Sequence, residues 1–211
     1  MTMPVYALVH GWRRHARRLR AVAAAAGALA LVAAGGPAGA AGPAVAQTLS
    51  GGGGAKNVVL LRNYQDRQTQ VAGSVQLNRV PGPSAAPLNL AQAYGSCADC
   101  QTLAVALQID LIARDATYIT PENAAVVENY GCTRCYTVAH AIQYVFQVDD
   151  PTYVPPDVAA LARELDLELT ALQATQGITV AEAEARIEAV EARFGELAWG
   201  LRDARNAAVA P

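Results

Sequence analysis

The fold is decided by a motif that occurs twice, as Tyr94-Gly95-Ser96-Cys97-Ala98-Asp99-Cys100-Gln101-Thr102-Leu103-Ala104 and as Tyr130-Gly131-Cys132-Thr133-Arg134-Cys135-Tyr136-Thr137-Val138-Ala139. From the cysteines onward the copies are offset by 35 positions (132 − 97), and Ser96 is a one-residue insertion in the first copy. Extended to Gln108 and Gln143, the copies share eight identical positions. All four cysteines lie in these segments, so we expect the chemistry of the chain there.

The amino terminus has the pattern of an export signal. Five arginines precede an apolar run at 21–34, and small-x-small cleavage motifs follow at 38–40 and 44–46. Because the run is too short to span a bilayer, we expect a signal peptide at 1–46 that is cleaved after Ala46 on the general secretory route. An uncleaved anchor is the alternative. The predicted location is secreted or at the extracytoplasmic cell surface, without a membrane span after cleavage.

The predicted mature chain is acidic. Five of the 16 Lys and Arg residues precede the cleavage site and all 18 Asp and Glu residues follow it, which leaves 11 − 18 = −7 over 165 residues (211 − 46). This charge argues against binding to nucleic acid or to anionic lipid. The length suits one domain, or a domain with an appendage. We therefore expect an unknown protein or cell-surface partner.

The predicted organisation has three parts after the signal. A flexible Gly-rich tether is expected at 47–55 and a duplicated CxxC domain at 56–150. Within that domain, β-prone runs at 57–62 and 71–80 flank a polar patch and predict a small N-terminal β-hairpin. A C-terminal antiparallel helical hairpin is expected at 151–211. The predicted fold class is mainly α, with each cysteine motif read as a helix–turn–CxxC–helix unit.

The segments around each CxxC are open to two interpretations. Thr120, Pro121 and Glu122 suit a helix start, and Gly95 and Gly131 suit helix ends with left-handed backbone. After the first CxxC, large apolar residues alternate with Ala, Gln and Asp from 103 to 111, which is the period of a strand. The run from 102 to 114 is long for a strand and rich in helix-forming residues, so length favours a helix.

The C-terminal segment has clear helical periodicity. Apolar residues recur on one face from Val158 to Leu172, Gly177 marks a turn, and 179–182 form a capping box. A heptad seam then predicts the second helix, and it could pair between chains as a homodimer through the C-terminal helices. The seam consists of Ala183, Ile187, Val190, Phe194, Leu197 and Leu201.

The four cysteines allow three kinds of chemistry. In an exported chain, disulfides are expected first, either within each motif (Cys97–Cys100 and Cys132–Cys135) or crossed between motifs. Loop-closure entropy gives about 2 kcal/mol for a four-residue ring and about 4 kcal/mol for a crossed loop. A zinc site with all four cysteines as ligands is the second alternative. Thiol–disulfide exchange is the third. Asp99 opposes reactivity in the first motif and Arg134 favours it in the second, so Cys132 and Cys135 would be the reactive pair.

Other side chains have weaker functional signals. His140 is expected to be a packed or partly exposed histidine and not a ligand. Asp99 and Arg134 are expected to pair across the motifs, and Gln108 and Gln143 to hydrogen-bond to each other. HExxH, GxSxG and a phosphate-binding loop are absent from the sequence. We therefore predict a structural or binding module without intrinsic enzymatic activity and without a cofactor, zinc excepted.

The chain resembles an uncharacterised exported module of actinobacteria and similar bacteria. The resemblance lies in 77–80, Asn89, the SCADCQTLA segment at 96–104, 120–123 and 129–135, and it covers most of the predicted mature chain. That module occurs alone or attached to membrane-bound putative peptide zinc metallopeptidases. The resemblance implies an extracytoplasmic location and no established activity. Proteolysis does not carry over, because the HExxH of the peptidase is missing here.

Overall fold

The computed structural model describes residues 45–48 and 55–209, with side chains described for 55–202. This part contains nine strands followed by two helices. They are β1 (Val45–Thr48), β2 (Lys56–Asn63), β3 (Thr69–Val80), β4 (Ser84–Ala85), β5 (Leu88–Gly95), β6 (Gln101–Ala113), β7 (Tyr118–Ile119), β8 (Glu122–Asn129), β9 (Tyr136–Val148), α1 (Pro156–Ala174) and α2 (Val180–Val209).

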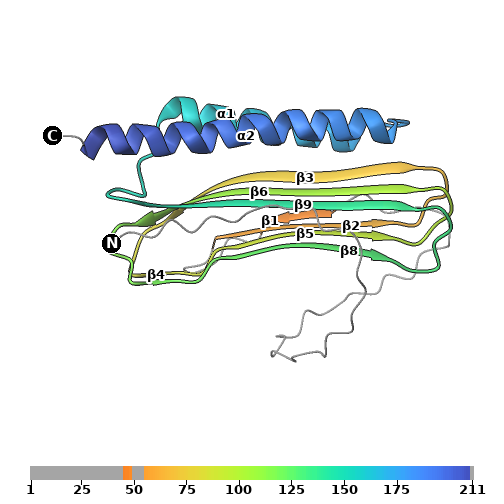
Figure 1. The fold of residues 1–211 in the computed structure, drawn as a ribbon, viewed down its shortest axis with the longest axis horizontal. Coiled ribbons are helices and arrows are strands. Elements are labelled where there is room, and N and C mark those ends of the chain that lie inside the picture. Colours follow the sequence, from red (N-terminus) through yellow and green to blue (C-terminus); the bar gives the residue numbers. More distant parts are fainter. Residues whose placement is uncertain (1–44, 49–54, 210–211) are drawn as a thin grey trace.

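The strands form a parallel β-solenoid of three coils. One sheet has the order β1-β2-β5-β8 and the other β3-β6-β9, with a short β4-β7 pair beside them. Apart from the antiparallel β1, all neighbours are parallel and in register. We call 56–87 the first coil, 88–121 the second and 122–148 the last. Figure 1 shows the two sheets as layers, with α1 and α2 along the outer side of β3-β6-β9.

The predicted mainly α class is wrong. In the described residues 46% lie in strands and 28% in helices, and the segments read as helix–turn–CxxC–helix units are strand–turn–strand units. The alternation along 103–111 was the correct signal. Its large residues, such as Leu103 and Leu107, face the helices, whereas Ala104 and Ala106 face the other sheet. Strands of a parallel sheet that are buried on both faces give near-continuous apolar runs. The length of the run at 102–114 therefore wrongly favoured a helix.

The predicted β-hairpin is also wrong. β2 and β3 follow each other in the chain but belong to different sheets, each paired with a strand of the second coil. The expected helix start at Thr120–Glu122 instead leads into β8. Gly131 has the expected positive φ of 60°, but Gly95 does not. β5 and β8 pair Gly95 with Asn129, an offset of 34 positions (129 − 95). Because the cysteines are offset by 35, the extra residue lies in the second copy, between Asn129 and Cys132, and not at Ser96 in the first.

Two helices end the chain and cover one sheet. Their apolar faces share a single core cluster with β3, β6 and β9, in which Leu165, Leu169 and Phe194 are fully buried. α1 packs tightly on the sheet at Gly73, where an added Cβ would stand 2.9 Å from Leu169 Cδ1. The heptad-seam residues of α2 also pack into this cluster. The homodimer through these helices stays a prediction, and it would have to use side chains that are already covered.

The two ends of the solenoid differ. On the first coil, β1 pairs along β2, and α1 packs on β3, where the Val75 N–H donates to Asp166 Oδ1 at 2.8 Å. On the last coil, β8 and β9 are the outermost strands of their sheets in the described residues. Residues 1–44 lie outside this part, as does 49–54 of the expected tether. Within it, no helix is long and apolar enough to cross a membrane.

Candidate functional site

The turns that join the two sheets stack on one another, one per coil. They span 64–68, 96–100 and 130–135. Backbone hydrogen bonds link each turn to the next: the Arg67 N–H donates to the Ala98 carbonyl, and the Asp99 N–H donates to the Thr133 carbonyl. Arg67, Asp99 and Arg134 have positive φ values of 59°, 55° and 55°, so the three turns share one backbone shape. This stack brings the four cysteines together.

Both disulfides lie within a motif. Cys97 pairs with Cys100 and Cys132 with Cys135, and the described residues contain no free cysteine. The sequence left this connectivity open. The third residue of each CxxC is left-handed, which closes the turn tightly enough for a bond between neighbours three positions apart. Crossed pairing is therefore excluded for this state.

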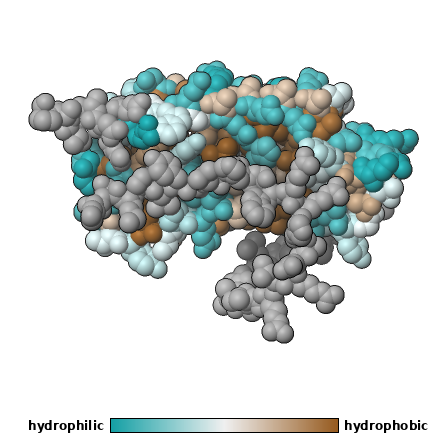
Figure 2. All heavy atoms as spheres, in the orientation of Figure 1, coloured by the Kyte–Doolittle hydropathy of each residue, from teal (hydrophilic) through white to brown (hydrophobic). Residues whose placement is uncertain are grey.

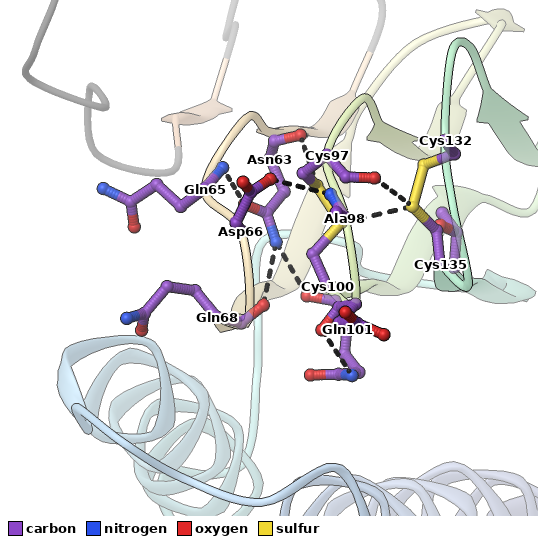
Figure 3. Close-up of a disulfide and its surroundings, with 12 residues drawn as sticks. Asn63, Gln65, Asp66, Gln68, Cys97, Ala98, Cys100, Gln101, Cys132 and Cys135 are labelled. Atoms are coloured by element: carbon purple, nitrogen blue, oxygen red, sulfur yellow. Dashed lines mark hydrogen bonds between the residues drawn. A yellow bond between two sulfur atoms is a disulfide. The ribbon is translucent and has the colours of Figure 1, made fainter.

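The two disulfides lie against each other. Cys100 Sγ and Cys135 Sγ are 3.4 Å apart, and the four sulfur atoms all lie within 4.8 Å of one another. Cys135 Sγ is also 2.9 Å from the Cys97 carbonyl oxygen, as Figure 3 shows. Cys97 and Cys100 are buried, whereas Cys132 and Cys135 are partly exposed. The pair in the last coil is thus the one that solvent reaches.

Charged side chains close the outer surface of the turns. Arg134 forms the predicted ion pair with Asp99, with Nη2 2.5 Å from Oδ2. Hydrogen bonding from Arg134 lowers the pKa of Asp99, and the charge of Arg67 acts in the same direction. On the other side, the Ala98 N–H donates to Asp66 Oδ1 at 2.7 Å. The pairing confirms that the two motifs are neighbours, although an exposed pair of this kind adds little stability because water and salt screen it.

Asparagines support the turns from within. Asn63 Nδ2 donates to the carbonyls of Gln68 and Gln101, and Asn129 Oδ1 accepts from Thr137 Oγ1 at 2.7 Å. Between these levels lies Gly95, where an added Cβ would stand 2.8 Å from Asn129 Oδ1. Gly95 is therefore needed for space and not for a left-handed backbone.

A ladder of three hydrogen-bonded asparagines crosses the interior, and it was not predicted from the sequence. Asn57 Nδ2 donates to Asn89 Oδ1 at 3.1 Å, and Asn89 Nδ2 to Asn123 Oδ1 at 2.8 Å. Asn123 Nδ2 in turn donates to the Ala141 carbonyl. The three hold the same position in β2, β5 and β8, so their recurrence at 32 and 34 residues was the available signal.

A second buried polar group surrounds Asp110. Its carboxylate accepts from Gln108, Asn78 and Gln143, so the two glutamines share this acceptor instead of bonding to each other as expected. Gln108 and Gln143 are paired in register, as the motif copies implied. Burial raises the pKa of Asp110 against the effect of the three donors.

His140 is partly exposed on β9 and faces α2. Its Nδ1 lies 2.5 Å from Glu191 Oε1, and this hydrogen bond raises the pKa of His140, with Glu184 and Glu188 adding to the effect. Tyr136 Oη donates to Glu184 Oε1 nearby. Tyr136, His140, Glu184 and Glu188 line a cavity of about 180 Å³ between β6, β9 and α2. Their contacts tie β9 to α2.

Among the described residues, nothing covers the solenoid interior at the last coil. Val127 is in register with Ala93 and Leu61, which are 0% and 1% exposed, yet Val127 is 48% exposed. Val126, Tyr130 and Tyr136 on the same coil are exposed as well. Figure 2 shows a mostly hydrophilic surface over the helices, with separate hydrophobic patches between and below them.

Comparison with protein families, with curated proteins and with solved structures finds no match.

Proposed function

We propose that this chain is an extracytoplasmic binding module, stapled by two disulfides, that acts as a scaffold without catalysis and binds its partner through the last coil. The observation that carries the proposal is the uncovered interior at Val127. Solenoids need a terminal cap with a polar outer face to stay soluble. The first coil has its cover in α1, which packs on β3, and in β1, of which Gln47 and Thr48 would remain after cleavage behind Ala46. A partner would supply the cover of the last coil.

The edge formed by β8 and β9 lacks the features that keep an edge strand unpaired. Natural edges carry inward charges, Lys, Pro or bulges. β9 runs for 13 residues without Lys, Arg, Asp, Glu or Pro, and β8 has glutamates only at Glu122 and Glu128. A long, weakly charged edge of this kind would cause aggregation unless it is a binding surface.

The partner we propose is a second copy of this chain, last coil against last coil. Antiparallel pairing about a twofold axis perpendicular to the sheets sets β8 beside its copy and β9 beside its copy, which makes the interface isologous. If the pairing is centred on Val126, Glu128 lies opposite Ala124 and no like charges face each other. Val127 of each chain then enters the interior of a continuous core.

Export is the second part of the proposal. The arginine-rich apolar segment at 1–46 supports it, and two disulfides are compatible with an oxidising compartment. The acidic balance of the predicted mature chain favours a soluble scaffold over binding to lipid or nucleic acid.

Light scattering coupled to size-exclusion chromatography tests the interface. The chain purified from an exporting host is expected to have the mass of a dimer, and Val127→Lys that of a monomer. Val127→Lys should fold, because the position is half exposed in the single chain. Leu167→Lys is the matched control, since Leu167 is 67% exposed on α1, away from the last coil. A monomeric wild-type chain, or a Val127→Lys variant that stays dimeric, contradicts the proposal.

A zinc-binding function is the second candidate, and the cluster of four sulfur atoms favours it. Zinc takes four thiolates at about 2.3 Å, and reduction of both disulfides would release four thiols within 4.8 Å of one another. Because both pairs are bonded here, the staple is the better-supported role. Intact mass with alkylation before and after reduction, together with metal content, separates the two. Two disulfides without metal support the staple, whereas four free thiols with one zinc ion support the metal site.

A further inference from the structure

We propose that the two disulfides form a single exchange site, in which a small thiol that attacks Cys132 sets off transfer of a disulfide from the buried motif to a bond between coils. The proposal goes beyond the binding function, and its test is separate from the test of pairing. It rests on the contact between the two disulfides and on their unequal exposure.

The contact between the two disulfides involves the sulfur atom that exchange would release. The sulfur that approaches the buried pair belongs to Cys135, at 3.4 Å from Cys100 Sγ. Cys132 Sγ instead lies beside Asn129 Oδ1, at 3.7 Å. A thiol that bonds to Cys132 therefore releases the one thiolate that already touches the second disulfide.

The reaction balances in two steps, each an attack of a thiolate on a disulfide sulfur. A monothiol RSH loses its proton and attacks Cys132 Sγ, so that a Cys132–SR mixed disulfide forms and the Cys132–Cys135 bond breaks. The released Cys135 thiolate attacks Cys100 Sγ, forming Cys100–Cys135 and breaking Cys97–Cys100. The Cys97 thiolate then takes up the proton. One thiol is consumed, one forms, and no net oxidation occurs.

The backbone can accommodate the new bond. Cys100 and Cys135 directly precede Gln101 and Tyr136, which are partners in the parallel pair β6–β9, and the Tyr136 N–H donates to the Cys100 carbonyl at 2.9 Å. Neighbouring strands lie about 4.8 Å apart. That separation lies within the range of about 4.4–6.8 Å that a disulfide spans between Cα atoms.

Exposure sets the order of events. Cys97 is 7% exposed and Cys100 0%, so the buried pair is shielded from an external thiol. Cys132 and Cys135 are partly exposed in the last coil. Reducing equivalents that arrive from outside would thus reach the buried motif through Cys135. The substrates this site fits are small thiols or exposed peptide thiols of the extracytoplasmic space.

The Cys132→Ser variant tests the transfer without any added thiol. It leaves Cys135 as a free thiol beside an intact Cys97–Cys100 bond, and we expect acid quenching, alkylation and peptide mapping to find a Cys100–Cys135 bond with alkylated Cys97 in a substantial fraction of molecules. Cys135→Ser is the matched control, which frees Cys132 and is expected to retain Cys97–Cys100. A Cys132→Ser variant in which only Cys135 is alkylated overturns the proposal.

A second measurement uses the unaltered protein, in case the variants fail to fold. With reduced glutathione below one equivalent, the expected product carries glutathione on Cys132, a Cys100–Cys135 bond and a free Cys97. Glutathione on Cys132 with a free Cys135 and an intact Cys97–Cys100 bond contradicts the transfer.

Discussion

Asn89 shows how much one buried side chain determines at the residue scale. Its Nδ2 donates to the carbonyls of Ala106 and Ile142 and to Asn123, and its Oδ1 accepts from Asn57. It therefore joins all three coils to one another. A buried carbonyl that loses its donor costs about 1–3 kcal/mol.

The Asn89→Ala variant is expected to lower the free energy of unfolding by about 3 kcal/mol, because the carbonyls of Ala106 and Ile142 and the side-chain oxygen of Asn123 each lose a donor. Asn123→Ala, at the exposed end of the same ladder, is expected to cost about 1 kcal/mol, since water can replace its bonds. Urea unfolding measures both. Equal losses for the two variants would mean that the ladder does not act through burial.

His140 gives the protein a pH-dependent contact. Because Glu191 raises the pKa of His140 above its ordinary value of 6.5, the folded state binds the proton more tightly than the unfolded state. The resulting stabilisation is fully present below about pH 6.5 and is lost as pH rises through the raised pKa. The groups that face His140 are Glu184, Glu188 and Glu191.

The stability advantage of the wild-type chain over His140→Gln is expected to be larger at pH 5.5 than at pH 9. Thermal unfolding of both proteins across this range measures the difference. Asp110 also has a raised pKa and also stabilises the fold at low pH, but it is present in both proteins, so its contribution cancels in the difference. An advantage that does not change with pH, or that grows toward pH 9, would rule out the charged contact with Glu191.

Some residue contacts could be predicted from the sequence and others could not. The Asp99–Arg134 pair follows from matching positions in the two motifs and from opposite charge, and it is confirmed. The bond expected between Gln108 and Gln143 is wrong, because Asp110, two positions from Gln108, is a stronger acceptor for both. A charged acceptor buried among amides is set by the three-dimensional packing, and no local pattern indicates it.

At the scale of elements, the turns of the cysteine motifs were easier to predict than the strands that follow them. The CxxC turns could be located from the sequence, whereas the strands after them were misread as helices. β6 buries large residues against α1 and α2 and alanines against the other sheet, so both of its faces look apolar. The first coil has Gln65 and Gln68 where the other turns have cysteines, which hid it as a member of the same stack.

The two disulfides are expected to differ in their contribution although their rings are equal in size. Closing a four-residue ring gives each about 2 kcal/mol. Cys97→Ala with Cys100→Ala also empties a buried site, so we expect it to cost about 1–2 kcal/mol more than Cys132→Ala with Cys135→Ala. Urea unfolding under non-reducing conditions compares them. A larger loss for the exposed pair would contradict the burial argument.

At the scale of the whole molecule, the sequence predicted the two C-terminal helices but not the solenoid. The recurrence of Asn57, Asn89 and Asn123 was the available signal, since parallel coils of 32 and 34 residues stack these three positions on one another. The contrast between a covered first coil and an open last coil arises from the complete fold. The proposed partner surface could therefore not be read from any single segment.

Amide hydrogen exchange at the last coil tests the central claim most directly. In a single chain, the N–H groups of β8 and β9 that point away from β5 and β6 have no strand partner in the described residues. We predict that these amides exchange slowly at high protein concentration, where last coils pair, and rapidly on dilution, while β5 and β6 stay protected throughout. Fast exchange of these amides in β8 and β9 at every concentration would contradict the account.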